Sequence, residues 1–540
     1  MRGTCPYHAR VGTSSPGGRD LESGASAPGV LRLLARVPEG RALALLLAAN
    51  LGLTIAAAVS SDSVFQVDEY FQVVEFASHK LGLTPAQDLP WEFRARIRPW
   101  LQPAAYSLLA RPALAAGIHD PFALLRIYRL ASGLLSWLAL FALLAALRHW
   151  FAEALGRRAA YLSLTLLYFL PYLAARTSSE SLSTTFLLLG LALLVRGGTG
   201  DAGDAGLPPL RGIAAGIALG LAVECRYQVA MSVAGVLLWT LALGRDRVKV
   251  LGSIGLGIAL SLAAGFLVDA WGYGEPVLVP WNYFRVNVLE GKAATFGVLP
   301  IFAYPFVLLL TFPPYGAIIF AGLASFWWRF PRHLLTWFTL PFFLGHSLIA
   351  HKEFRFLFPL LVPGTLCLLL LWARSASLPE RLGAVLGTLQ AVWFSRVTWA
   401  FNTLALAVLC FLPSSDNFGL QRYFYEHARD PVRWVGFSDP SRPHGIKAPF
   451  LAPRPAPRYE PLATLEDLAR EVSHSPVPVM VTAKYPMPKG VEEFLAHHGK
   501  RVFASLPPIL ATANLFRWVE RADLNYVYLI EPPSRTAAER

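Results

Sequence analysis

Four ionisable residues lie within five positions of the sequence, between two long apolar runs: His351, Lys352, Glu353 and Arg355. The flanking runs, HLLTWFTLPFFLGHSLIA and LFPLLVPGTLCLLLLW, are each long enough to cross a hydrocarbon core of about 30 Å. We therefore expect the cluster at a membrane surface. A lone cation there would be an interfacial anchor, whereas an acid within a basic trio favours a site that binds an anionic ligand.

A second group that could do chemistry follows the first apolar run, where Asp68 and Glu69 are adjacent. Acids are common at helix starts because they complement the macrodipole, so a structural role is one interpretation. A carboxylate beside a membrane site can also act as a general base. Residues 67–79 are predicted to form an amphipathic helix in the interface plane, with Asp68, Glu69, Gln72 and Glu75 on its polar face.

Further candidates for substrate contact are single charged residues near the ends of apolar runs. Arg176 and Glu180 are four apart, so they are either an i,i+4 pair or ligand contacts. Arg226 is either an interfacial anchor or a donor contact. Asp269 follows an apolar run and precedes WGYG, so it either ends a helix or serves an acceptor site or a structural loop.

The composition identifies the elements that must position these residues. Of 540 residues, 54% are hydrophobic and 15% are charged, and the mean hydropathy is +0.45, which indicates a multispanning membrane protein. The net charge of +13 fits basic inner loops and anionic lipid headgroups better than nucleic acid. The four cysteines show no paired spacing, so we expect neither a disulfide framework nor a metal site.

The apolar runs predict a polytopic α-helical fold with about eleven transmembrane helices, at residues 41–60, 121–147, 159–175, 182–196, 211–224, 228–244, 249–268, 300–328, 333–350, 355–373 and 384–412. If the N-terminus is cytoplasmic, every inner loop is basic. The same count places Asp68, Glu180, Arg226, Asp269 and the 351–355 cluster on the opposite face. We therefore expect an active centre that faces away from the cytoplasm.

The domain organisation follows from changes in composition. Residues 1–30 are predicted to be a disordered cytoplasmic tail, 31–412 the transmembrane domain, with 61–120 as its first outer loop, and 413–540 an extracytoplasmic domain. Apolar runs at 477–483 and 525–533 resemble strands, while 464–472 and 490–499 resemble helices. We therefore expect a small C-terminal α/β domain of unassigned role.

Several of these motifs resemble the pattern of glycosyltransferase family 22, and within it the branch of the third mannosyltransferase of GPI-anchor synthesis. They are Asp68-Glu69-Tyr70, WEFRARIRP at 91–99, the run from Ala175 to Ser181, Asp269 with GYGEPVLVPWNYFRVNVLEG, and HKEFRF at 351–356. The resemblance covers about residues 40–375. The sequence departs from the family pattern at Val67, where the family usually has Pro.

The resemblance implies a C-type glycosyltransferase (GT-C) fold and a lipid-phosphate sugar donor. Asp68 would be the catalytic acid of the first loop, with Glu69 as its companion. His351, Lys352 and Arg355 would bind the donor phosphate, and Glu353 would orient them. The implied reaction is an inverting transfer of mannose from polyprenyl (dolichyl-type) phosphate mannose to a hydroxyl of a GPI-like glycolipid acceptor.

We expect no metal or other cofactor, because the outer face carries no DxD motif or histidine cluster with metal-ligand spacing. The expected location is the endoplasmic reticulum membrane in a eukaryote or the inner membrane in a bacterium. Another lipid-linked sugar is the nearest alternative. A lipid or sugar transporter, or a flippase, is disfavoured because the charges gather at span ends on one face and no internal repeat is detectable.

Overall fold

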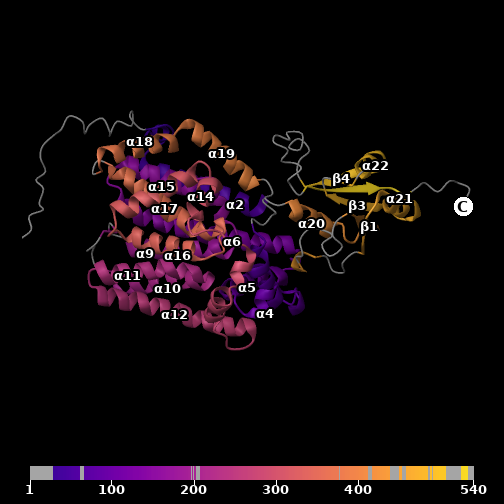
Figure 1. Cartoon of the computed structure of the whole chain (residues 1–540), viewed down its shortest axis with the longest axis horizontal. Helices are drawn as coiled ribbons and strands as arrows, with labels where there is room; N and C mark the ends of the chain where they lie inside the picture. Colours follow the sequence, from indigo (N-terminus) through magenta and orange to yellow (C-terminus); the bar gives the residue numbers. More distant parts are fainter. Residues whose placement is uncertain are drawn as a thin grey trace, which may run out of the picture.

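The computed structural model describes residues 28–540 except 61–65, 196–197, 199, 202–206, 376–377, 412–415, 438–448, 453–457, 485–486, 489, 506–523 and 533–540. Nearly all of the predicted N-terminal tail lies outside the described residues. The chain folds into a large helical body, joined through α20 (Asp416–Glu426) to a smaller part that contains a β-sheet (Figure 1).

The helical body begins with α1 (Leu31–Ala35), α2 (Glu39–Ser60), α5 (Leu101–Ala115), α6 (Pro121–Leu147), α7 (Ala154–Leu166), α8 (Phe169–Ala174), α9 (Ser179–Val195), α10 (Pro209–Cys225), α11 (Ala230–Leu243) and α12 (Arg247–Tyr273). It continues with α13 (Val279–Phe284), α14 (Ala303–Thr311), α15 (Tyr315–Arg329), α16 (Leu334–Leu348), α17 (Phe358–Ala373), α18 (Glu380–Trp393) and α19 (Arg396–Phe411). Every apolar run that was predicted to span the membrane is therefore mainly helical.

Three predicted spans are each divided between two helices. The 300–328 run breaks into α14 and α15 at Pro313 and Pro314, which have no backbone N–H to donate. The 159–175 run forms α7 and α8, and the 384–412 run forms α18 and α19, which are bent by 49°. In the described ranges, four helices are long and apolar enough to cross a membrane, or five if the bent pair is one span. The count of about eleven spans stays a prediction.

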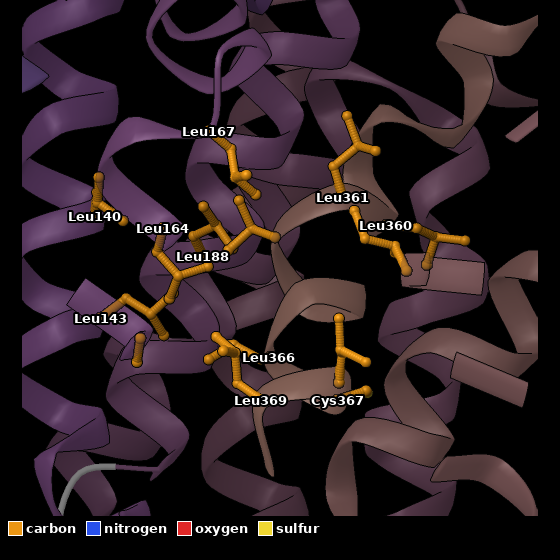
Figure 2. Packing of buried hydrophobic residues seen from close by; sticks show 14 of the residues in the cluster. Leu140, Leu143, Leu164, Leu167, Leu188, Leu360, Leu361, Leu366, Cys367 and Leu369 are labelled. Carbon is orange, nitrogen blue, oxygen red and sulfur yellow. The ribbon is translucent and has the colours of Figure 1, made fainter. Parts of the chain in front are cut away.

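Helix α17 occupies the centre of the helical body. Its side chains from Phe358 to Trp372 are all buried, so the helix is apolar on every face instead of amphipathic. The helix packs against α7 and α9, and Figure 2 shows Leu366 and Leu369 on the side of α17 that faces Leu164 and Leu188. Because α17 begins just after the 351–355 cluster, this packing fixes the position of the cluster at one end of the helical body.

Helices α10 and α12 pack closely along a stripe of small residues. Gly212, Gly216 and Gly220 of α10 face Ser253, Gly257 and Ser261 of α12, and the backbones approach closely enough that a Cβ at Gly216 would lie 2.1 Å from the carbonyl oxygen of Ile254. The α10 series ends at Glu224, whose carboxylate occupies the space that Gly265 leaves open. This packing fixes the end of α12 that carries Asp269.

The predicted outer loop is largely helical. It contains the π-helix η2 (Tyr70–Val74), α3 (Glu75–Lys80), the 3₁₀ turn η3 (Ala86–Asp88) and α4 (Trp91–Ala95), followed by the unpredicted 15-residue helix α5. The helix expected at 67–79 is present, but most of its predicted polar face is buried within the protein. Glu69, Gln72 and Glu75 are buried, because α5, α6 and a C-terminal segment pack around them.

The C-terminal part contains a five-stranded sheet in the order β2-β1-β3-β5-β4, made of β1 (Arg433–Gly436), β2 (Tyr459–Pro461), β3 (Val479–Lys484), β4 (Lys500–Ala504) and β5 (Asn525–Ile530). β1 is parallel to β2 and β3, whereas β5 is antiparallel to β3 and β4. Helices α21 (Leu465–His474) and α22 (Val491–His498) lie beside it (Figure 1). The strands and helices expected from the four short runs are all observed.

Candidate active site

A cavity of about 880 Å³ lies between the predicted first outer loop and the 351–355 cluster. Its wall combines residues far apart in the sequence: Asp68, Phe71 and Gln72 at the start of the loop, Trp91, Arg94 and Arg98 further along it, Arg226, Tyr283, Phe296, and His351, Glu353 and Arg355. The segments that the sequence placed on one face thus enclose a single cavity that is lined by both acids and cations.

Arg355 joins the two halves of this cavity. It is carried by the 3₁₀ turn η8 (Phe354–Leu357), directly before the buried helix α17. Its Nη2 donates to Asp68 Oδ2 at 2.5 Å and to Glu353 Oε1 at 2.9 Å, and its Nε donates to Glu353 Oε2 at 2.6 Å. Such a forked contact with a carboxylate fixes both the position and the orientation of the guanidinium group.

His351 completes this arrangement. Its Nε2 lies 3.0 Å from Glu353 Oε1, and its Nδ1 lies 2.9 Å from the carbonyl oxygen of Gly297. Glu353, which His351 orients, therefore holds Arg355 from one side, while Asp68 contacts it from the other. The Nε and Nη2 atoms of Arg355 contact carboxylates. Its Nη1 atom makes no hydrogen bond or ion pair to the described residues, so this nitrogen is available to a ligand.

The electrostatic environment keeps two acids of the cavity wall, Asp68 and Glu353, ionised. Burial alone would raise the pKa of Asp68, but the positive charges of Arg355, Arg98 and Arg226 outweigh burial and lower it. Burial likewise opposes ionisation of Glu353, and its contacts with Arg355 and His351 lower its pKa below the usual value. Asp68 is therefore a carboxylate near neutral pH and can accept a proton.

Glu180 lies behind this cluster and is buried. Its Oε1 is 2.9 Å from Nη1 of Arg226 and 3.7 Å from Nε of Arg355, so one carboxylate pairs with two cavity cations. The ring of Phe356 lies 4.9 Å from the Arg226 guanidinium and 5.5 Å from that of Arg355. Glu180 is thus placed to hold the two cations and does not itself line the cavity. Arg176 precedes α9, so it does not form an i,i+4 helical pair with Glu180.

Besides Glu180, four predicted site residues lie outside the cavity wall. Glu69 is buried and accepts from Thr177, and the Lys352 ammonium group donates to the backbone carbonyls of Leu299 and Ile349 at 3.0 and 2.6 Å. Two more bind backbone groups elsewhere: Arg176 donates to the carbonyl of Ala57, and Asp269 accepts from the Trp100 amide at 2.7 Å. These contacts are structural, so direct contact with a ligand in this cavity is not expected of them.

Arg98 is a cavity residue that the sequence analysis did not single out. Its backbone is held by α12: the Tyr273 hydroxyl donates to the Arg98 carbonyl at 2.8 Å, and Asp269 binds the amide of Trp100 two residues later. The Arg98 side chain is 20% exposed and lies 3.7 Å from Glu92. The basic spacing in WEFRARIRP was the available signal, but it did not indicate that Arg94 and Arg98, and not Arg96, line the cavity.

The described residues contain no group of three or more His, Cys, Asp or Glu side chains arranged to hold a metal ion. Four arginines line the cavity: Arg94, Arg98, Arg226 and Arg355. Arginine keeps its charge at any physiological pH, and its planar fork matches the geometry of carboxylates and phosphates.

Comparison with known proteins assigns the family. Residues 44–426 match the model of the Alg9-like mannosyltransferase family, and this range includes every cavity residue named above. The chain belongs to this family. The predicted resemblance to glycosyltransferase family 22 is thereby confirmed, as is the prediction that the chain is a member of an enzyme family of glycosyltransferases.

The curated relatives include GPI mannosyltransferases. Mannosyltransferase APTG1 of Arabidopsis thaliana is 27% identical over 58% of this chain and 55% of its own length, and GPI mannosyltransferase 3 of Yarrowia lipolytica is 27% identical over 57% and 58%. The human GPI alpha-1,2-mannosyltransferase 3 is 26% identical over 55% and 52%. The chain therefore spans little more than half the length of the relatives it matches.

Among solved structures, the chain is similar to ArnT from Cupriavidus metallidurans in the apo state. That match has 14% sequence identity and a TM-score of 0.48, and it covers 90% of this chain and 97% of ArnT.

Proposed function

We propose that this chain is an inverting mannosyltransferase with a GT-C fold, which transfers mannose from a polyprenyl (dolichyl-type) phosphate mannose to a hydroxyl of a glycolipid. The observation that carries the proposal is the contact between Asp68 and Arg355 in the cavity. This contact brings a carboxylate that can accept a proton next to a cation that can bind a phosphate.

In the proposed reaction, the acceptor oxygen forms a bond to the anomeric carbon while the bond from that carbon to the donor phosphate oxygen breaks. Asp68 accepts the proton of the acceptor hydroxyl, a role that typically contributes about 10²–10⁴-fold to the rate. The electron pair of the broken bond stays on the departing polyprenyl phosphate. That phosphate gains negative charge, which Arg355 stabilises through its Nη1.

The geometry favours a different set of donor-phosphate residues from the set that the family resemblance implies. Arg226 and Arg98 line the cavity and are better placed for this task than Lys352, which binds two backbone carbonyls. His351 and Glu353 act by orienting Arg355. Lys352 would then stabilise the loop between the 297–299 segment and η8, without contact to the donor.

The proposed acceptor is a GPI-like glycolipid, by analogy with the GPI mannosyltransferases among the relatives. The proposed site faces the lumen of the endoplasmic reticulum or the outer side of a bacterial inner membrane, because the sequence places its basic loops on the other side. We also propose that the reaction needs no metal ion. Transfer should persist in the presence of a chelator, and loss of transfer that a divalent ion restores would contradict this part of the proposal.

The experiment measures transfer of labelled mannose from polyprenyl phosphate mannose to a membrane glycolipid extract by the purified protein in lipid. Arg355→Ala should reduce the rate of mannose transfer by about a hundredfold or more, because it removes the cation that faces the donor phosphate. Arg374→Ala is the matched control, since Arg374 pairs with Asp201 at the other end of α17. Equal rates for the two variants would overturn the assignment of Arg355, and a silent wild type would indicate another lipid-linked sugar or a transport function.

A further inference from the structure

A short C-terminal segment packs against the helix that follows Asp68. We call residues 449–452 the strap; it contains the 3₁₀ turn η10 (Pro449–Leu451). Phe450 is 5% exposed and Leu451 is fully buried. The strap contacts α3 and α6, although α3 lies about 370 residues earlier in the sequence. The family match ends at residue 426, so the strap lies outside the part of the chain that defines the family.

Glu75 links the strap to the outer loop. Its side chain is fully buried, and its Oε1 accepts a hydrogen bond from the backbone amide of Phe450 at 3.1 Å. Its Oε2 accepts from Thr84 Oγ1 at 2.8 Å and from Ser78 Oγ at 3.4 Å. One carboxylate therefore binds the strap, the end of α3 and the following turn, and a buried carboxylate is retained only where such partners are present.

Apolar contacts surround this hydrogen bond. The ring of Tyr70 in η2 lies 5.8 Å from that of Phe418 and 6.4 Å from that of Phe450. Tyr70 and Leu451 belong to the same buried cluster as Val73, Val74, Ala77 and residues of α5 and α6. The strap thus completes a small core that holds one face of the η2–α3 helix.

The other face of the same helix forms the cavity wall. Phe71 and Gln72 line the cavity, and Asp68 precedes η2 by two residues. η2 is also a π-helix, a conformation that is rare and occurs often at functional sites. A displacement of the strap-bound face would therefore move Asp68 relative to Arg355.

We propose that the strap and Glu75 are positioning elements for the transfer reaction: they hold the η2–α3 helix so that Asp68 stays in contact with Arg355. The inference rests on the proposed function, because the position of Asp68 affects turnover only if Asp68 acts in transfer. It assigns to the C-terminal part a role in catalytic geometry, in addition to its own folding.

The test compares variants of the full chain in the mannose-transfer assay. Glu75→Ala removes the acceptor for the Phe450 amide, and Leu451→Ala removes a buried strap side chain. Glu75→Gln keeps an acceptor oxygen. Leu495→Ala is the matched control, because Leu495 is an equally buried leucine of α22. It belongs to the core of the C-terminal sheet and not to the buried cluster that contains Tyr70 and Leu451.

We expect Glu75→Ala and Leu451→Ala to lower kcat by about tenfold or more, with the KM for the donor little changed, since small misplacements of a reacting group are costly. Glu75→Gln should restore most of the rate, and Leu495→Ala should keep it. A KM effect alone, or equal kcat values for Leu451→Ala and Leu495→Ala, would overturn the proposal.

Hydrogen exchange supplies a second measurement that does not depend on activity. Leu451→Ala should accelerate exchange in residues 66–80, and Leu495→Ala should accelerate it only in the C-terminal sheet. If Leu451→Ala leaves exchange in residues 66–80 unchanged, the strap holds nothing and the inference fails, whether or not the chain transfers mannose. A silent wild type with the expected exchange pattern would instead count against the proposed function alone.

Discussion

The buried carboxyl of Glu75 should make the stability of the protein depend on pH. Burial raises the pKa of Glu75 to about 7 from an ordinary value of 4.5, although hydrogen bonds from Phe450, Thr84 and Ser78 oppose the rise. The folded protein therefore binds this proton more tightly than the unfolded chain does. The resulting stabilisation is complete below pH 4.5 and is lost as the pH rises to about 7.

The size of this effect follows from the two pKa values. Each pKa unit corresponds to about 1.4 kcal/mol, so raising the pH from 4.5 to above 7 should cost the fold about 3 kcal/mol through Glu75. Glu75→Gln cannot ionise, and it should be free of this loss. The unfolding temperature of the wild type should therefore fall relative to that of the variant as the pH rises.

The assay is thermal unfolding of the purified full chain, in the same lipid or detergent, at several values between pH 5 and pH 8. Glu466→Gln, at an exposed position in α21, is the matched control and should keep the pH dependence of the wild type. If wild type and Glu75→Gln show parallel curves, the buried carboxyl does not titrate in this range. A wild type that gains stability relative to Glu75→Gln towards pH 8 would reverse the sign of the argument.

Two further substitutions test the site and the helix packing. Arg355→Lys should lower kcat for mannose transfer by about tenfold or more, because an ammonium group cannot bridge two carboxylates and a phosphate as a guanidinium does. The control Arg374→Lys should keep the wild-type rate in the same assay. Gly216→Ala in α10 should lower stability by about 1–3 kcal/mol in thermal unfolding, because its Cβ would lie 2.1 Å from the backbone carbonyl oxygen of Ile254. Gly252→Ala in the facing helix α12 meets nothing within 4 Å and should be tolerated.

Much of the site was predictable because the residues lie at the ends of apolar runs. Asp68 and Arg355 are 287 positions apart, yet the count of predicted spans assigns both to the same face of the membrane domain. The structure places them in contact. Such a count assigns a segment to one end of a helical bundle, which suffices to bring charged segments together. It does not give side-chain directions within a segment.

The directions depend on contacts with distant parts of the chain. Lys352 and Arg355 are three residues apart, but the first donates to the carbonyls of residues 299 and 349 while the second lines the cavity. The directions differ because Arg355 lies in the 3₁₀ turn η8, whereas Lys352 precedes that turn. The burial of Glu75, which the sequence predicts on the polar face of an amphipathic helix, has a similar cause. Its partner, the Phe450 amide, lies 375 residues away and leaves no periodic pattern near Glu75.

The most direct test of the central claim is the rate of mannose transfer by Asp68→Asn compared with Asp201→Asn. Both variants replace an acid that pairs with an arginine, but Asp201 lies at the opposite end of α17 from the cavity. If Asp68 accepts the proton of the acceptor hydroxyl, Asp68→Asn should lose a factor of about 10²–10⁴ in kcat, and Asp201→Asn should match the wild type. If the folded Asp68→Asn protein transfers mannose at the wild-type rate, Asp68 is not the base and the proposed mechanism is wrong.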